Sequence, residues 1–150
     1  MEEEKEVCDL FAFDGMVAAA AAKQKLQDGS TVFTGLFRVL QSALYQANYQ
    51  WWHDPKTGEK LNRNSGELLM LMVSEIAEGM EGVRKGLNDD HLPNRRMIEV
   101  ELADAVIRIL DFAEANNLDI GGALVEKALY NLNREDHKIQ NRLKDGGKKF

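Results

Sequence analysis

The sequence is poor in cysteine, proline and aromatic residues, and each scarcity excludes a class of protein. With Cys8 as the one cysteine, the chain has no internal disulfide and no thiolate zinc site, and an incidental thiol in a reducing compartment is the favoured interpretation. Two prolines and 7% aromatic residues are too few for a sandwich or barrel with many turns. The composition therefore favours helices.

Long apolar runs are also missing. The longest run, from Met16 to Ala22, falls far short of the ~20 residues that a membrane span needs. The first six residues are mostly acidic, which is the wrong charge for a secretory signal. We therefore expect a soluble cytoplasmic protein that does not bind membranes.

Positive charge is in the minority, with 19 Lys and Arg against 25 Asp and Glu and a net charge of −6. Such a chain offers no general surface for nucleic acid, so stable nucleic-acid binding is not expected. Its 150 residues, 44% of them hydrophobic, are enough for one globular domain with its own core.

Apolar residues recur at helical spacing along most of the chain, and alternating β-branched runs are absent. Residues 28–31 (Asp-Gly-Ser-Thr) are interpreted as a helix stop followed by a new N-cap, and Pro93 lies in an expected loop. The predicted helices span residues 7–27, 31–49, 65–86, 97–116 and 120–142, between a frayed acidic start (1–6) and a basic tail (146–150). The expected fold is an all-α bundle of four or five helices, forming a single domain over residues 1–150.

The predicted helix 97–116 is apolar around most of its circumference. Its polar stripe falls within an arc of about 80° on a helical wheel and consists of Glu101, Asp104, Arg108 and Asp111. A helix this apolar is buried on most sides. The stripe therefore faces either an internal cleft or a narrow exposed edge.

The predicted helix 65–86 favours the cleft, because a carboxylate interrupts its apolar face. Glu75 lies between Leu68 and Leu71 on the wheel, and Glu78 lies at the border of that face. An isolated carboxylate there would cost several kcal/mol or take up a proton. Two such acidic pairs on apolar helices predict a carboxylate cluster around a hard divalent cation, Mg²⁺ or Mn²⁺.

A basic stripe on the predicted helix 120–142 supplies the opposite charge. It falls within an arc of about 60° and consists of Lys127, Asn131, Arg134 and Lys138. A solvated face is the commoner explanation of such a stripe. In an acidic protein with a carboxylate cluster, however, a cationic stripe suits a polyphosphate that bridges metal and protein.

These residues resemble a known signature. The pattern Glu75-Ile-Ala-Glu78, twenty-two intervening residues and Glu101-Leu-Ala-Asp104 resembles that of the MazG-like, all-α nucleoside triphosphate pyrophosphohydrolases. Ser74, the run from Val106 to Asp111 and Lys127-x-x-x-Asn131-x-x-Arg134 add to the resemblance. It covers residues 51–150 and is similar to the phage-type single-domain members through its Trp51-Trp52 pair and its Gly-Gly-Lys-Lys-Phe ending. It departs from many relatives at Gly82, where they carry an acidic residue.

The resemblance implies metal-dependent hydrolysis of a (deoxy)nucleoside triphosphate to its monophosphate and pyrophosphate, in control of the nucleotide pool. The implied catalytic and metal-binding residues, around one to three Mg²⁺ or Mn²⁺ ions, are Glu75, Glu78, Glu101 and Asp104. The implied phosphate-binding residues are Lys127, Asn131 and Arg134, to which the basic stripe adds Lys138.

Base recognition and assembly are less defined by these motifs. Trp51, Trp52 and Tyr130 are candidates for contact with the base, although tryptophans more often cover a core. Candidate substrates are dGTP or GTP, dUTP, dCTP and non-standard nucleotides. Family members associate, so a homodimer or homotetramer is expected, in the host cytoplasm if a phage encodes the chain.

Other functions fit the sequence less well. A di-iron protein needs Glu-x-x-His pairs, and none of His53, His91 and His137 has one. An HD-type phosphohydrolase needs a histidine upstream of His53, and P-loop chemistry needs a Gly-x-x-x-x-Gly-Lys loop; both are absent. The remaining alternative is a non-catalytic helical module whose acidic and basic stripes bind a partner protein.

Overall fold

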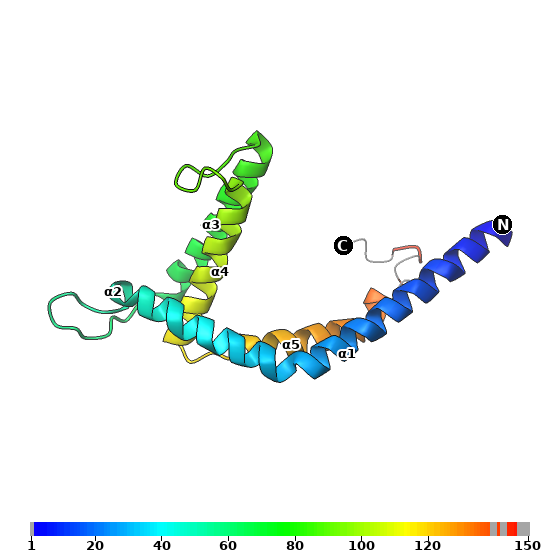
Figure 1. Ribbon diagram of the computed structural model, residues 1–150, viewed down its shortest axis with the longest axis horizontal. Coiled ribbons are helices and arrows are strands. Elements are labelled where there is room, and N and C mark those ends of the chain that lie inside the picture. Colours follow the sequence, from blue (N-terminus) through cyan, green and yellow to red (C-terminus); the bar gives the residue numbers. More distant parts are fainter. Residues whose placement is uncertain (1, 139–140, 142–143, 147–150) are drawn as a thin grey trace. The chain divides into compact units, whose positions relative to one another are not determined.

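The computed structural model describes the backbone of residues 2–138, 141 and 144–146, and the side chains from residue 15 onward within these ranges. The described residues form helices and loops and no strand (Figure 1). The helices are α1 (Glu2–Ala47), α2 (Tyr49–Trp52), α3 (Ser65–Lys85), α4 (Met97–Ala115), α5 (Ile120–Leu132) and the 3₁₀ turn η1 (Glu135–His137). The all-α prediction is confirmed. The Cys8 side chain and the tail residues 147–150 lie outside the described part of the chain.

The chain divides into two compact units. One unit comprises residues 1–36 and 120–150 and therefore holds α5 and most of α1. The other comprises residues 37–119, with the end of α1 and all of α2, α3 and α4. Among the helices that the structure describes, none is both long and apolar enough to span a membrane.

The predicted break at residues 28–31 is wrong, because α1 continues through it. Two hydrogen bonds within the helix involve residues of this segment. The Gln24 amide donates to the Asp28 carboxylate at 2.8 Å, and the Thr34 hydroxyl donates to the Ser30 carbonyl at 2.8 Å. Glycine in a helix costs about 1 kcal/mol, and a Cβ on Gly29 would lie 3.0 Å from the Phe33 ring. The helix therefore accommodates the glycine.

The predicted helix 120–142 is too long. Helix α5 ends at Leu132, and the Arg134 backbone is extended, with φ −68° and ψ 129°. The Asn133 side-chain amide donates back to the Leu129 carbonyl at 2.9 Å and so occupies an acceptor at the helix end. Residues 133–138 contain no aliphatic side chain to bury, so packing does not reward a further turn.

Helices α3 and α4 begin and end where the sequence predicts. The Asn64 side chain accepts from the Gly66 backbone N–H at 2.9 Å, which caps the start of α3. Gly86 ends α3 in the left-handed conformation, with φ 64°, which a residue without a Cβ adopts at little cost. Helix α4 begins at Met97 and is followed by Asn116.

Helices α3 and α4 pack against each other along their length (Figure 1). The buried residues of α3 are Glu75, Gly79 and Gly82, so small side chains rather than large apolar ones form its contact face. A Cβ on Gly79 would lie 2.9 Å from Ile98 Cδ1, and a Cβ on Gly82 would lie 2.8 Å from Met97 Cβ. This close approach brings the acidic residues of the two helices together.

The end of α4 is anchored by polar groups from two other segments of its unit. The buried Gln41 side chain donates to the Leu118 carbonyl at 2.9 Å, and Lys60 Nζ donates to the Ala115 carbonyl at 2.6 Å. The bond to Ala115 satisfies a carbonyl that the helix end leaves without a partner, and the bond to Leu118 holds the loop that follows α4. The nearby buried apolar residues are Trp52, Leu110, Ala113 and Ala115.

Candidate metal centre and adjoining cavity

Three of the four predicted carboxylates converge between α3 and α4. Oxygen atoms of Glu75, Glu78 and Glu101 all lie within 4.8 Å of one another. Glu75 and Glu101 are buried, with 6% and 7% of their surface exposed, whereas Glu78 is exposed. The cluster is thus open to solvent on the Glu78 side and closed behind it.

The cluster is electrostatically unfavourable without a cation. Burial raises the pKa of the Glu101 carboxyl, and the Glu78 charge and a hydrogen bond to Glu75 raise it further. A hydrogen bond between two carboxyl groups requires one of them to hold a proton. On the other side of Glu75, Arg108 Nε donates to Glu75 Oε1 at 2.6 Å.

The donor set fits a hard divalent cation. Carboxylate oxygens are the ligands that Mg²⁺ and Mn²⁺ prefer, and these cations keep open positions for water and phosphate. Glu75 and Glu78 follow each other by three residues on α3, so both reach the same side of the helix. Close packing of the α3 glycines against α4 brings Glu101 to them from the opposite helix.

Asp104 does not join this group. It is half-buried one turn after Glu101 and lines a cavity of about 520 Å³ instead. Its negative charge still raises the pKa of Glu101. The structure therefore brings three predicted ligands together and places the fourth beside them.

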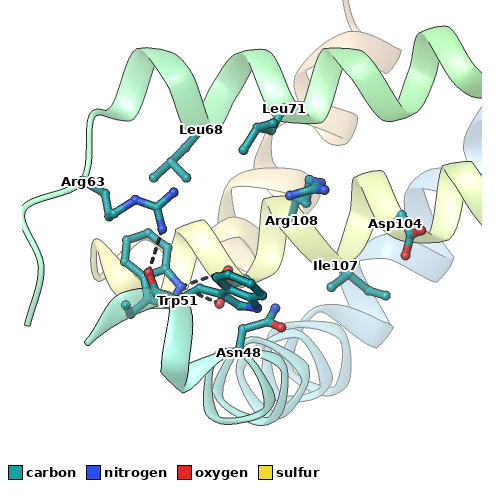
Figure 2. Close-up of a pocket in the computed structure, with 10 residues that line it drawn as sticks. Asn48, Trp51, Arg63, Leu68, Leu71, Asp104, Ile107 and Arg108 are labelled. Carbon is teal, nitrogen blue, oxygen red and sulfur yellow. Dashed lines mark hydrogen bonds between the residues drawn. The ribbon is translucent and has the colours of Figure 1, made fainter. Parts of the chain in front are cut away.

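Arg108 lines the cavity (Figure 2). Because Arg108 also bonds to Glu75, the cavity adjoins the carboxylate cluster. Its volume lies within the ~300–1,000 Å³ of typical ligand pockets. Its lining mixes aromatic, aliphatic, polar and charged side chains from the turn between α1 and α2, the end of α2, the following loop, α3 and α4: Asn48, Trp51, Trp52, Arg63, Leu68, Leu71, Asp104, Ile107, Arg108 and Asp111.

The two tryptophans differ in environment. Trp52 is buried, its Nε1 donates to both Asp111 oxygens at 2.9 Å, and the Arg63 guanidinium lies 5.9 Å from its ring centre. Trp51 is 63% exposed at the cavity, and its carbonyl accepts from Arg63 at 2.6 Å. Trp52 thus fixes the wall, whereas Trp51 keeps a free ring surface.

Asp111 is held in the wall of the cavity by this network. Burial raises the pKa of its carboxyl, more than the Trp52 and Asn48 hydrogen bonds and the Arg108 and Arg63 charges lower it. Its position on α4 continues the predicted polar stripe. Of the four stripe residues, Asp104, Arg108 and Asp111 line the cavity, and Glu101 lies in the carboxylate cluster.

The predicted phosphate-binding residues belong to the other unit. Lys127 and Asn131 lie on α5, and the Lys127 ammonium is 4.7 Å from the Tyr130 ring centre. Because α5 ends at Leu132, Arg134 and Lys138 do not continue its face. Arg134 forms two hydrogen bonds with Asp136, at 2.9 and 2.6 Å, and Lys138 pairs with Glu135.

Sequence reasoning assigned no role to four residues that shape this site. Arg108 and Asp111 were visible in the polar stripe of α4, but their partners lie 33 and 59 positions away along the chain. Asn48 and Arg63 had no signal, since neither belongs to a periodic pattern or a motif.

Comparison of the chain with protein-family models, with curated proteins and with solved structures found no match.

Proposed function

We propose that the chain is a metal-dependent nucleoside triphosphate pyrophosphohydrolase of the MazG-like kind. The observation that carries the proposal is the convergence of Glu75, Glu78 and Glu101 within 4.8 Å, next to a cavity of ligand size. A carboxylate cluster that holds a cation, next to a cavity lined by aromatic side chains, suits a ligand with an anionic end and a planar end. A nucleoside triphosphate has both.

In this proposal Glu75, Glu78 and Glu101 hold Mg²⁺ or Mn²⁺, with Asp104 beside them. The cation supplies charge neutralisation and an activated water for attack on the α-phosphorus. The buried carboxylates keep the anionic substrate from approaching the cluster unless a cation is present. The rigid α3–α4 contact fixes their spacing.

The cavity accommodates the base. Trp51 presents a free aromatic surface, and stacking on a base contributes about 1–3 kcal/mol. Asn48 and Asp111 provide polar groups at the same cavity. Trp52 keeps a structural role, because it is buried and its indole N–H is occupied by Asp111.

Phosphate binding by Lys127, Asn131, Arg134 and Lys138, with Tyr130 near the base, remains part of the proposal. Lys127 and Asn131 follow each other by four residues on α5 and so share a face. Arg134 and Lys138 form ion pairs with Asp136 and Glu135. Binding of a triphosphate by these two residues would require an exchange of partners.

We also propose a homodimer or homotetramer, in the cytoplasm. An apolar stripe runs along α3 with alternating spacings of four and three residues, the pattern of a helix–helix seam. Its five residues are 49–63% exposed: Leu69, Val73, Ile76, Met80 and Val83. Helix α4 carries a shorter stripe with the same spacing, formed by Leu102, Val106 and Ile109.

The two stripes lie on the same side of the α3–α4 pair. In each helix a stripe residue directly follows a buried one, as Ile76 follows Glu75 and Leu102 follows Glu101. Gly79 meets Glu101 and Gly82 meets Met97, so the two helices run antiparallel. This offset of about 100° therefore turns both stripes to one side. Leu71 and Asp104 are offset in the other direction and line the cavity. A second copy can therefore pack on the stripes to form a four-helix bundle while the cavity stays open.

The test is an assay of pyrophosphate release from the eight common ribo- and deoxyribonucleoside triphosphates, with Mg²⁺ or Mn²⁺. At least one substrate should yield monophosphate and pyrophosphate, and Glu78→Gln should remove most of this activity. Glu67→Gln, an exposed carboxylate on the first turn of α3, is the matched control and should keep it. No turnover of any nucleotide would favour the helical interaction module.

A further inference from the structure

The ion pair between Arg108 and Glu75 places a protein cation on a carboxylate of the cluster. Arg108 Nε lies 2.6 Å from Glu75 Oε1, and this bond occupies an oxygen of a cluster carboxylate. The Glu75 side chain is 8% exposed and cannot turn to solvent, whereas the Arg108 side chain is 43% exposed. Of the two partners, only the arginine has space into which it can move.

That space is the cavity. Arg108 lines it together with Asp104 and Asp111, and Figure 2 shows the Arg108 side chain between α3 and α4 at the cavity edge. The guanidinium is therefore adjacent both to the cluster and to the ligand-sized space. A planar guanidinium also binds phosphate with two parallel hydrogen bonds.

We infer that Arg108 is an exchangeable counter-cation: it neutralises Glu75 in the metal-free protein, gives Glu75 up to the divalent cation, and then binds the triphosphate from the cavity side. This inference rests on the proposed function. Its physical basis is charge balance. A guanidinium and a divalent cation repel each other and compete for the same carboxylate, while an arriving triphosphate gives the displaced guanidinium a new anion.

Competition for Glu75 can be measured without turnover. We would titrate Mn²⁺ into the wild-type protein, Arg108→Gln and Arg108→Lys, and follow free Mn²⁺ by electron paramagnetic resonance. Removing the competing charge should lower the Mn²⁺ dissociation constant of Arg108→Gln by about tenfold. Arg108→Lys keeps the charge and should stay close to the wild type. Arg84→Gln, which removes an exposed arginine paired with Glu81 on α3, is the matched control and should also bind as the wild type does.

The second step is measured with inorganic triphosphate as the probe, at saturating Mn²⁺. Arg108→Gln should bind the probe about tenfold more weakly than the wild type, and Arg84→Gln should not differ from it. Exchange predicts that Arg108→Gln binds Mn²⁺ more tightly and triphosphate more weakly. A purely structural role of Arg108 predicts that both Mn²⁺ and triphosphate bind more weakly.

The inference is overturned if the wild type binds Mn²⁺ and Arg108→Gln binds it equally or more weakly, since Arg108 would then only hold Glu75 in place. It is also overturned if triphosphate binding is unchanged in Arg108→Gln. A failure of the proposed function looks different: neither the wild type nor Arg108→Gln would bind Mn²⁺.

Discussion

At the scale of single residues, the site is defined by side chains whose burial and partners differ despite similar chemistry. Glu75 and Glu101 are buried and Glu78 is exposed, although all three belong to one cluster. Trp51 and Trp52 are sequence neighbours, yet one is exposed and the other is in the core. Residues that belong to the same sequence motif therefore lie in different environments.

The first prediction concerns Asp111 and pH. The folded-state pKa of its carboxyl is raised above the ordinary value of 3.8, mainly by burial, so the folded protein binds this proton more tightly than the unfolded chain. The resulting penalty on folding is present above the folded-state pKa and is relieved as the pH falls through it toward 3.8. Asp111→Asn does not titrate. The Tm of the wild type, measured in EDTA relative to that of Asp111→Asn, should therefore rise as the pH is lowered through this window. A difference that stays constant, or that falls, would contradict the burial argument.

The second prediction separates the two tryptophans. Trp51→Leu should raise KM for the preferred nucleotide by roughly tenfold, which corresponds to about 1.4 kcal/mol of lost stacking, with little change in Tm. Trp52→Leu should instead destabilise the fold by roughly 2–4 kcal/mol, because it loses buried surface and leaves Asp111 without its indole donor. The measurements are steady-state kinetics and denaturant unfolding of both variants. A lower stability of Trp51→Leu with an unchanged KM would assign Trp51 to the core.

At the scale of helices, α3 and α4 carry the site because they approach closely. The contact is set by Gly79 and Gly82, whose missing side chains make room for Ile98 and Met97. This packing also leaves no room at Gly82 for the acidic side chain that the resembled pattern carries there. An acidic side chain there would have no space, since even a Cβ would lie 2.8 Å from Met97 Cβ.

The third prediction tests this contact. Gly82→Ala should destabilise the protein by roughly 1–3 kcal/mol and weaken Mn²⁺ binding, because Met97 Cβ can move only with its backbone. Gly35→Ala in α1 is the control, since its new Cβ would meet nothing within 4 Å. It should stabilise the protein by roughly 0.5–1 kcal/mol. The measurements are urea unfolding and Mn²⁺ titration. Equal effects of the two substitutions would show that the helices do not depend on the glycines.

Capping residues in the sequence predicted the ends of α3 and α4 correctly, whereas the continuity of α1 and the end of α5 were predicted wrongly. Asn64 and Gly86 act within one turn of the helix ends that they cap, so a sequence pattern suffices to find them. The continuity of α1 could not be predicted in this way. A glycine such as Gly29 can end a helix or lie inside one. The outcome depends on hydrogen bonds from neighbouring turns, such as those of Gln24 and Thr34. The end of α5 was missed because Arg134 and Lys138 fitted the helical arc without any apolar residue to hold a further turn in place.

The candidate site shows the same limit. The acidic motifs predicted that α3 and α4 would bring carboxylates together, and three of the four predicted residues converge. The bond from Arg108 to Glu75 and the bond from Trp52 to Asp111 could not be predicted, because each joins segments distant in sequence. Such contacts depend on the packed helices and on no motif.

At the scale of the whole molecule, the exposed stripes on α3 and α4 give the fourth prediction. The protein should sediment as a dimer or tetramer. Val73→Lys, in the middle of the α3 stripe, should shift it toward the monomer, because a charge in a helix seam must be desolvated. Leu92→Lys places the same charge on an exposed leucine of the α3–α4 loop and should not change the assembly. Sedimentation velocity, with circular dichroism to confirm helical content, checks both. A monomeric wild type, or an unchanged Val73→Lys oligomer, would show that the stripes bind no second copy.

The fate of the solvent oxygen reports directly on the proposed hydrolysis. The preferred nucleoside triphosphate is hydrolysed in H₂¹⁸O with Mg²⁺ or Mn²⁺, and the products are analysed by mass spectrometry. Attack of water on the α-phosphorus predicts that the label enters the nucleoside monophosphate, that unlabelled pyrophosphate is released, and that Glu78→Gln and EDTA each remove the reaction. Labelled orthophosphate with a nucleoside diphosphate, or label in the pyrophosphate, would show that water does not attack the α-phosphorus.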